Sequence, residues 1–236
     1  MKALARWIAL VVIAGCALEV FFIARIAMAA TVDPASTTFE RSEAFRIART
    51  KGRLPWAQEW VPYSQISDNL KRAVIASEDD SFATHDGVDW EALEKAWDRN
   101  QKAQERVAKP QRTAKIVGGS TITQQLAKNL LLSGERTLLR KGQEIVLTFA
   151  LEQMMGKERI LEIYLNSVEW GEGVFGAEAA ARHYFHKGAA QLSPYEAARL
   201  AVMLPRPKYF EKLPNSGYLA ARASTIAARM RGAELP

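Results

Sequence analysis

The sequence predicts a mainly α-helical protein in which an N-terminal transmembrane helix precedes an exported domain. Three observations support this fold class. Residues 7–24 form one apolar run. After about residue 65, apolar side chains recur at helical spacing almost everywhere. Helix-start signals of the type Ser/Thr-x-x-Glu/Gln precede two of these runs. Strand-like alternation is scarce, and only "WGEGVFG" at 170–176 is typical of a tight loop or hairpin.

Residues 1–30 are predicted to be a cytoplasmic start followed by an uncleaved membrane anchor. The run "WIALVVIAGCALEVFFIA" spans about 27 Å at helical rise, close to the ~30 Å apolar thickness of a bilayer. Lys2 and Arg6 precede it and should stay in the cytoplasm, so the rest of the chain is exported. A cleaved signal peptide is the alternative, because "AMAA" at 27–30 resembles a cleavage site. Glu19 weakens the anchor interpretation, since a carboxylate inside a membrane is costly unless it is neutral or paired.

Local signals set the first helix boundaries of the domain. Residues 31–55 are predicted to be a linker, and the domain is expected to occupy residues 56–236. Ser67 can cap the first helix of the domain. Thr121 and Gln124 form a capping box ahead of a further apolar run.

The second half of the domain is also predicted to be helical. Residues 137–155 form a long amphipathic run, and "KERILEIYLN" follows it. The strongest start signal is "SPYE" at 193–196, where a serine cap, a proline at the first helical position and a closing glutamate follow one another. That helix should stop before Pro205, and a last helix should run from about Tyr218 to Gly232.

Composition narrows the function classes. The chain of 236 residues has a net charge of +6. Such a charge suits nucleic acid, an anionic membrane surface or a phosphorylated substrate, as well as ordinary solubility. Cys16 is the one cysteine, which excludes a disulfide within the chain and a cysteine-based metal site. The three histidines lack a metal-ligand spacing, so no metal-binding residues are predicted.

One basic segment stands apart from the helical pattern. Between Arg99 and Lys115 there are six basic residues against one acid, and Trp90, Leu93 and Trp97 share one helical face just before it. A solvated helix and loop would explain this composition. The alternative is a mobile flap on anionic lipid, with the tryptophans at the level of the headgroups.

Three clusters of polar residues follow helical runs or open them. They are "EDDSFATHDG" at 78–87, "GGSTITQQLAKN" at 118–129 and "RKGQE" at 140–144. Each cluster has an ordinary structural explanation when it is taken singly. An acidic turn is usually solvated, a Ser/Thr run is usually a cap, and an Arg-Glu pair four residues apart is usually a surface ion pair.

Together these clusters resemble a known family. Adding "KERILEIYLN" at 157–166 and "GVFGAEAAARHYFHK" at 173–187 gives five segments, in order, that resemble the motifs of the peptidoglycan glycosyltransferases, glycosyltransferase family 51. The resemblance covers roughly residues 56–210. It implies a lysozyme-like, mainly helical fold and polymerisation of lipid II with inversion at the MurNAc anomeric carbon. No S-x-x-K or K-T-G motif is present, so no transpeptidase domain is expected.

The resemblance assigns the two catalytic carboxylates and the cations. It gives Glu78 the role of the base that activates the acceptor's 4-OH, since a sugar hydroxyl is a poor nucleophile. Arg140, Lys141 and Lys128 become the partners of the leaving polyprenyl diphosphate, which accumulates negative charge. Glu144 is the second carboxylate, and it either orients these cations or assists the leaving group.

The other predicted substrate-binding residues belong to the first two clusters. Neutral hydrogen bonds to sugar or phosphate are expected from Ser120, Thr121, Gln124, Gln125 and Asn129, and further contacts from Asp79, Phe82 and His85. Phe82 and His85 have a structural alternative, namely that they hold the turn that exposes Glu78. No cofactor is required by these residues, although the resemblance is compatible with a divalent cation, Mg²⁺ or Mn²⁺, for which Asp79 is a candidate contact.

The resemblance also implies partners and a location. The expected partners are lipid II, the growing glycan chain, membrane lipids and other proteins of cell-wall synthesis and division. Export excludes nucleic acid, and the expected location is the bacterial inner membrane with the domain on the periplasmic side. Two rivals remain open. A hydrolase or lytic transglycosylase would also use two carboxylates but needs no diphosphate partners, and a non-catalytic scaffold would not need intact carboxylates.

Overall fold

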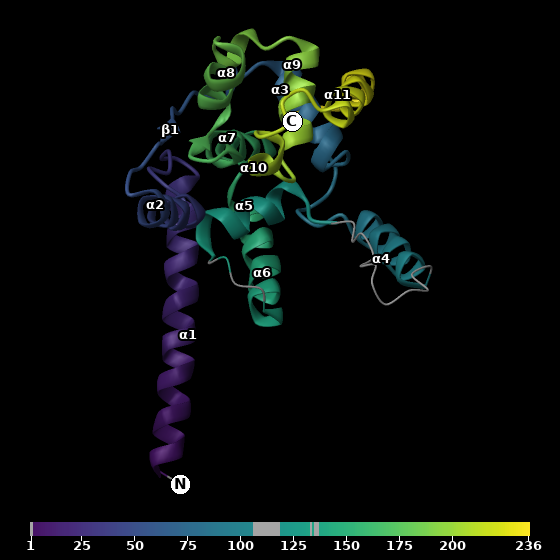
Figure 1. The fold of residues 1–236 in the computed structure, drawn as a ribbon. Coiled ribbons are helices and arrows are strands. Elements are labelled where there is room, and N and C mark those ends of the chain that lie inside the picture. The colour runs from purple at the N-terminus through teal and green to yellow at the C-terminus, as the bar shows by residue number, and fades with distance from the viewer. Residues whose placement is uncertain (1, 106–118, 133, 135–136) are drawn as a thin grey trace.

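The computed structural model describes residues 2–105, 119–132, 134 and 137–236, and this part of the chain is mainly helical (Figure 1). In chain order the elements are α1 (Lys2–Ala29), α2 (Thr38–Lys51), β1 (Ala57–Gln58), α3 (Asp68–Glu78), α4 (Trp90–Glu105), α5 (Ile122–Leu131), α6 (Leu138–Met154), α7 (Lys157–Ser167), β2 (Glu169–Gly171), β3 (Val174–Phe175), α8 (Ala177–Phe185), α9 (Pro194–Met203), α10 (Pro207–Phe210) and α11 (Gly217–Arg229). The predicted fold class is confirmed.

The predicted helix caps are present. The Ser67 side chain accepts a hydrogen bond from the backbone of Asn69 at the start of α3. Thr121 and Gln124 close a reciprocal capping box at α5. Ser193 forms the same box at α9, with a proline in the first turn. Because each box satisfies two backbone N–H groups that have no partner within the helix, the helices begin where the sequence indicated.

The core includes two packed helix pairs, α3 with α9 and α5 with α7, and α11 covers α3 and α9. Its largest fully buried side chains include Trp170, Tyr164 and Phe82. The indole N–H of Trp170 donates to the backbone carbonyl of Leu200 at 3.1 Å, so burial leaves no polar atom of that ring unpaired. Figure 1 shows α8, α9 and α11 gathered at one end of the domain, while α1 and α6 extend from the other end.

A three-stranded sheet forms around the predicted hairpin. The strand order is β1-β3-β2, with β2 antiparallel and β1 parallel to β3. Gly173 turns the hairpin with a φ of 80°. A Cβ at this position would lie 2.1 Å from the carbonyl oxygen of Pro55. Only glycine therefore allows the strand that follows Pro55 to join the sheet.

Helix α2 lies within residues 31–55, which were expected to be a linker. Thr37 and Glu40 close a capping box at its start, and Gly52 ends it in the left-handed conformation. Ile47 is fully buried, and the hydroxyl of Thr38 donates to the carbonyl of Leu130 on α5 at 3.1 Å. The sequence contains the start signal T-x-x-E and the terminal glycine of this helix. The polar composition of the segment, between Pro34 and Pro55, was nevertheless typical of a linker.

Helix α1 is long and apolar enough to cross a membrane by length and composition, and almost all of its span is exposed. Near its end, Phe22 and Ile26 are buried against the domain. Glu19 lies in its apolar run, and its carboxylate accepts a hydrogen bond of 3.2 Å from the amide of Gln143 on α6. This hydrogen bond offsets part of the free-energy cost of placing a carboxylate in an apolar run. Helix α6 runs beside α1 in Figure 1.

Two apolar surfaces that the sequence placed on helices are exposed. On α6, Leu138 is 93% exposed and Phe149 is 40% exposed, so the amphipathic run 137–155 is only partly covered by the core. On α4, Trp90 and Trp97 are exposed. Of the basic segment that follows them, residues 106–115 lie outside the described residues, and the lipid-contact hypothesis for it stays a prediction.

Candidate active site

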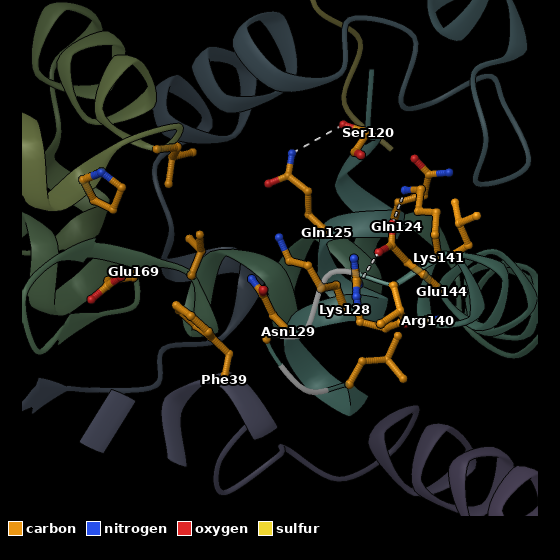
Figure 2. A pocket seen from close by; sticks show the side chains of 17 residues that line it. Phe39, Ser120, Gln124, Gln125, Lys128, Asn129, Arg140, Lys141, Glu144 and Glu169 are labelled. Carbon is orange, nitrogen blue, oxygen red and sulfur yellow. Dashed lines mark hydrogen bonds and ion pairs between the residues drawn. The ribbon is translucent and has the colours of Figure 1, made fainter. Parts of the chain in front are cut away.

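A cleft of about 710 Å³ opens between α5, the start of α6 and the β2 region (Figure 2). Both polar and apolar residues line it, and most of the polar ones come from α5 and α6. The lining residues are Phe39, Ser120, Gln124, Gln125, Lys128, Asn129, Leu132, Gly134, Thr137, Leu138, Arg140, Lys141, Glu144, Val168, Glu169, Leu204 and Pro207. Eight of the thirteen predicted site residues are among them, so the structure brings the second and third clusters together.

Glu78, the last residue of α3, meets this cleft through Gln125. The amide N–H of Gln125 donates to Glu78 Oε2 at 3.0 Å, and the hydroxyl of Tyr164 donates to Gln125 Oε1 at 3.0 Å. Burial is the largest cause that raises the pKa of Glu78, and the negative charge of Asp79 raises it further. The hydrogen bond from Gln125 and the charge of Lys128 act in the opposite direction. A glutamate in this environment suits proton abstraction near neutral pH.

Asp79, His85 and Phe82 hold the turn that follows Glu78. Asp79 is buried, and its two oxygens accept from His85 Nε2 at 2.8 Å and from the backbone N–H of Ile122 at 2.9 Å. His85 Nδ1 in turn accepts from the backbone of Gly87, which fixes the tautomer. These bonds tie the turn to the start of α5.

Phe82 lies in the core rather than at the cleft. Its side chain is fully buried, and the ammonium of Lys157 lies 4.7 Å from its ring centroid. A residue with no exposed surface cannot contact a substrate. The geometry therefore favours the structural alternative for Phe82 and His85, and it extends that role to Asp79.

Some residues around the start of α5 stabilise the helix, and others line the cleft where a substrate could contact them. Thr121 is buried, and its hydroxyl donates to the carbonyl of Gly87 at 2.6 Å while it caps α5. Gln124 is engaged in the same capping box but still lines the cleft. Ser120 is exposed there, and Asn129, which follows Gln124 by five residues on α5, also lines the cleft.

The other part of the cleft carries positive charge around one carboxylate. Glu144 is buried, with Arg140 Nη1 2.8 Å from its Oε2 and Lys141 Nζ in an ion pair with its Oε1. The Thr137 side chain caps α6 just ahead of these residues. Because both oxygens of Glu144 are paired, its geometry fits a group that orients cations, and Figure 2 shows Arg140 and Lys141 converging on it.

Comparisons with known proteins identify the family of the chain. The family model described as Transglycosylase matches residues 47–231. The chain belongs to the transglycosylase family. The "Biosynthetic peptidoglycan transglycosylase" of Burkholderia thailandensis is 51% identical to it over all of this chain and 90% of the relative. Proteins with the same description from Paraburkholderia xenovorans and Bordetella pertussis are 52% and 55% identical over 98% and 86% of this chain, and over 94% and 82% of the relatives.

The family accounts for the architecture of this transglycosylase. Its mainly helical domain has the lysozyme-like fold expected from the resemblance. The matched region begins at residue 47, inside α2. Helix α2 also contributes Phe39 to the lining of the cleft.

Sequence reasoning missed three residues of the transglycosylase cleft or its support. They are Phe39, Tyr164 and Glu169. Tyr164 was visible within "KERILEIYLN", but only the fold brings its hydroxyl to Gln125. Glu169 opens β2, where it is buried 3.2 Å from the ammonium of Lys208. Burial nevertheless raises the pKa of Glu169 to about 7.

Glu169 should make the stability of the transglycosylase depend on pH. In the unfolded chain this carboxyl ionises near 4.5, whereas in the folded chain it stays protonated up to about 7. Its stabilising contribution is therefore complete below pH 4.5 and is lost as the pH rises through 7. The unfolding free energy of the wild type should fall relative to that of Glu169→Gln by up to about 3 kcal/mol between those limits. Thermal melting of both proteins in one detergent across this pH range measures the difference, and parallel curves would contradict it.

Asp79, the candidate contact for a divalent cation, does not fit one. Both oxygens of Asp79 already accept hydrogen bonds from protein groups, and both oxygens of Glu144 are held by cationic side chains. Among the described residues, no group of three or more His, Cys, Asp or Glu side chains could hold a metal ion. The hydrogen bonds of Asp79 instead support the turn that follows Glu78.

Proposed function

We propose that this peptidoglycan transglycosylase polymerises lipid II, with Glu78 as the base and a cationic cluster as the partner of the leaving diphosphate. The observation that carries the proposal is the joining of two chemistries at one cleft. A carboxylate with a raised pKa is linked to the cleft by Gln125, and Arg140, Lys141 and Lys128 line the cleft itself.

The proposed step is a displacement at the MurNAc anomeric carbon. Glu78 takes the proton of the acceptor's 4-OH while the oxygen forms the new glycosidic bond. The bond between the anomeric carbon and the diphosphate oxygen breaks on the opposite face, so the configuration inverts, and polyprenyl diphosphate leaves with the electron pair. Arg140 and Lys141, held by Glu144, are aimed to neutralise this developing charge.

Polymerisation distinguishes this proposal from a hydrolase on the same polymer. The purified chain should lengthen fluorescent lipid II into a ladder of glycan strands and release polyprenyl diphosphate. It should leave finished glycan at its original length. Parallel reactions with a chelator test whether a divalent cation takes part. Shortening of finished glycan without growth on lipid II would favour the lytic alternative instead.

We further propose that α1 is an uncleaved anchor that keeps the cleft at the periplasmic face of the inner membrane. Helix α1 is apolar enough to span a bilayer, and α6 runs beside its C-terminal half. Leu138 and Leu139 at the start of α6 are almost fully exposed, and Leu138 borders the cleft. An apolar rim of this kind suits a substrate whose polyprenyl chain stays in the bilayer.

The anchor can be checked directly. Mass spectrometry of the protein from membranes should find peptides that include residues 1–29, because the apolar run at 7–24 is longer than the ~7–15-residue core of a cleaved signal peptide. A mature chain that starts at Ala30 would show instead that the segment is a cleaved signal.

The hydroxyl of Tyr164 should position Gln125 for its bond to Glu78. A change of Tyr164 to Phe removes one neutral hydrogen bond, which is worth about 0.5–1.5 kcal/mol, so polymerisation should fall roughly two- to tenfold with a folded protein. The matched control is Tyr218→Phe on α11, whose side chain is exposed. Equal rates for Tyr164→Phe and the wild type would remove Tyr164 from the site.

A further inference from the structure

A second pocket, of about 350 Å³, lies where α1 meets the domain. Two arginines line it, Arg25 from the last turns of α1 and Arg41 from α2. Its other walls are largely apolar and include Met28, Val32 and Leu130. None of its described lining residues belongs to the catalytic cleft.

No carboxylate among the described residues forms an ion pair with either arginine. Among the residues that the structure describes, Arg25 makes no hydrogen bond or ion pair, and its guanidinium lies 6.0 Å from the ring centroid of Phe21. The guanidinium of Arg41 donates to the backbone carbonyl and hydroxyl of Ser36 and to the hydroxyl of Thr38, each at 3.0 Å. These bonds to neutral oxygens fix the orientation of Arg41, and its only described carboxylate interaction is the electrostatic one with the neighbouring Glu40, which is buried and bonded to Thr37 and Gln58.

The carboxylate that lines the pocket forms an ion pair with an arginine from α7. Asp33 lines the same pocket, but its Oδ1 lies 2.8 Å from Arg159 Nη1. Arg159 is anchored in turn by Glu162 and by the backbone carbonyl of Ala29. The pocket therefore keeps an excess of positive charge from Arg25 and Arg41, and that excess selects an anion.

The position of the pocket along α1 selects the kind of anion. Arg25 directly follows the apolar run that ends at Ala24, so in a membrane its guanidinium lies at the level of the lipid phosphates. The apolar walls beside it suit the glycerol and upper acyl region of a lipid. Guanidinium groups bind phosphate through paired N–H donors better than a point charge does.

We propose that this pocket binds the phosphate of an anionic membrane lipid in the leaflet that faces the domain. The bound headgroup would bridge Arg25 on α1 and Arg41 on α2, and so fix the domain on its anchor. This inference rests on the proposed membrane anchor but not on the proposed chemistry. A lipid headgroup and free inorganic phosphate both offer a phosphate anion, so free phosphate is the alternative ligand that the experiment must distinguish.

Binding can be measured on the full-length protein in detergent. Native mass spectrometry would follow titrations with phosphatidylglycerol, phosphatidylcholine and inorganic phosphate. The wild type should retain phosphatidylglycerol in preference to both others. Arg25→Gln with Arg41→Gln should weaken that retention at least tenfold, as expected for the loss of two charge-assisted partners. Each single variant should show part of the loss, and these serve if the double variant does not fold.

The control variant removes two positive charges, as the test variant does, but at positions outside the pocket. Arg49→Gln with Arg53→Gln removes the same charge from exposed positions in and after α2, and it should bind phosphatidylglycerol as the wild type does. An equal loss in this control would reduce the effect to general electrostatics and overturn the proposal. Equal affinity of the wild type for inorganic phosphate would also overturn it, because the site would then be one for soluble anions.

A polymerisation assay separates this proposal from the proposed function. In detergent without phosphatidylglycerol, Arg25→Gln with Arg41→Gln should elongate lipid II at the wild-type rate. A folded variant that loses elongation there would show that the arginines serve the substrate itself and would overturn the lipid site. If the wild type does not elongate lipid II at all, the proposed function fails, while the lipid-binding result still decides the pocket.

Discussion

Replacing Glu78 by Gln should lower polymerisation by about 10²–10⁴-fold, the range typical of removing a general base. Gln is nearly isosteric and can keep the hydrogen bond to Gln125, but it cannot accept the proton of the acceptor hydroxyl. The variant should fold and should still bind lipid II, because the cationic residues that face the diphosphate are untouched. Rates on labelled lipid II, together with thermal melting, measure both effects.

Asp80→Asn is the matched control for this change. Asp80 follows in the same acidic turn, but it is exposed and its carboxylate lies 3.2 Å from an exposed arginine, Arg229. An exposed ion pair of this kind is worth at most about 1 kcal/mol, so its loss should leave polymerisation nearly unchanged. If Glu78→Gln kept near-normal chain growth, the base would be misassigned and Glu144 would become the next candidate.

Arg140→Ala should lower polymerisation by roughly 10²-fold or more, as the loss of one preorganised donor commonly does. The change removes a cation from the cleft and also leaves one oxygen of the buried Glu144 without its partner. Arg140→Lys should restore activity only in part, because an ammonium lacks the two-pronged geometry of a guanidinium. Steady-state rates at saturating lipid II would measure the loss.

Arg222→Ala on α11 provides the comparison for Arg140→Ala. Its side chain is exposed and lies outside the cleft, so this change removes the same charge without touching the site. Normal turnover in a folded Arg140→Ala protein would exclude Arg140 from the departure of the diphosphate. Equal losses in both variants would instead point to a general effect of net charge.

Local signals in the sequence predicted most of the helices and their starts. The capping boxes at Thr121 and Ser193 involve only four consecutive residues each, so they start a helix independently of what the helix packs against. The ion pairs of Glu144 with Arg140 and Lys141 are local as well, because residues three and four apart share a helical face. These parts of the site could be derived without a fold.

Contacts between distant segments could not be derived in this way. Gln125 meets Glu78 across 47 residues of sequence, and Tyr164 reaches the same amide from α7. Phe39 comes to the cleft from α2, whose polar composition was typical of a linker. For Phe82 the sequence left substrate contact and support of the turn both open, and only the packing, which buries its side chain fully, favours support.

The pH dependence of polymerisation tests the central claim, that ionised Glu78 is the base, most directly. The base must be deprotonated, so kcat/KM should rise with pH through a midpoint above the ordinary glutamate value of 4.5. The hydrogen bond from Gln125 lowers the pKa of Glu78. Loosening it by Tyr164→Phe should therefore move the midpoint to higher pH, with the wild type measured alongside. A midpoint at the ordinary value, or one that Tyr164→Phe leaves in place, would contradict the account.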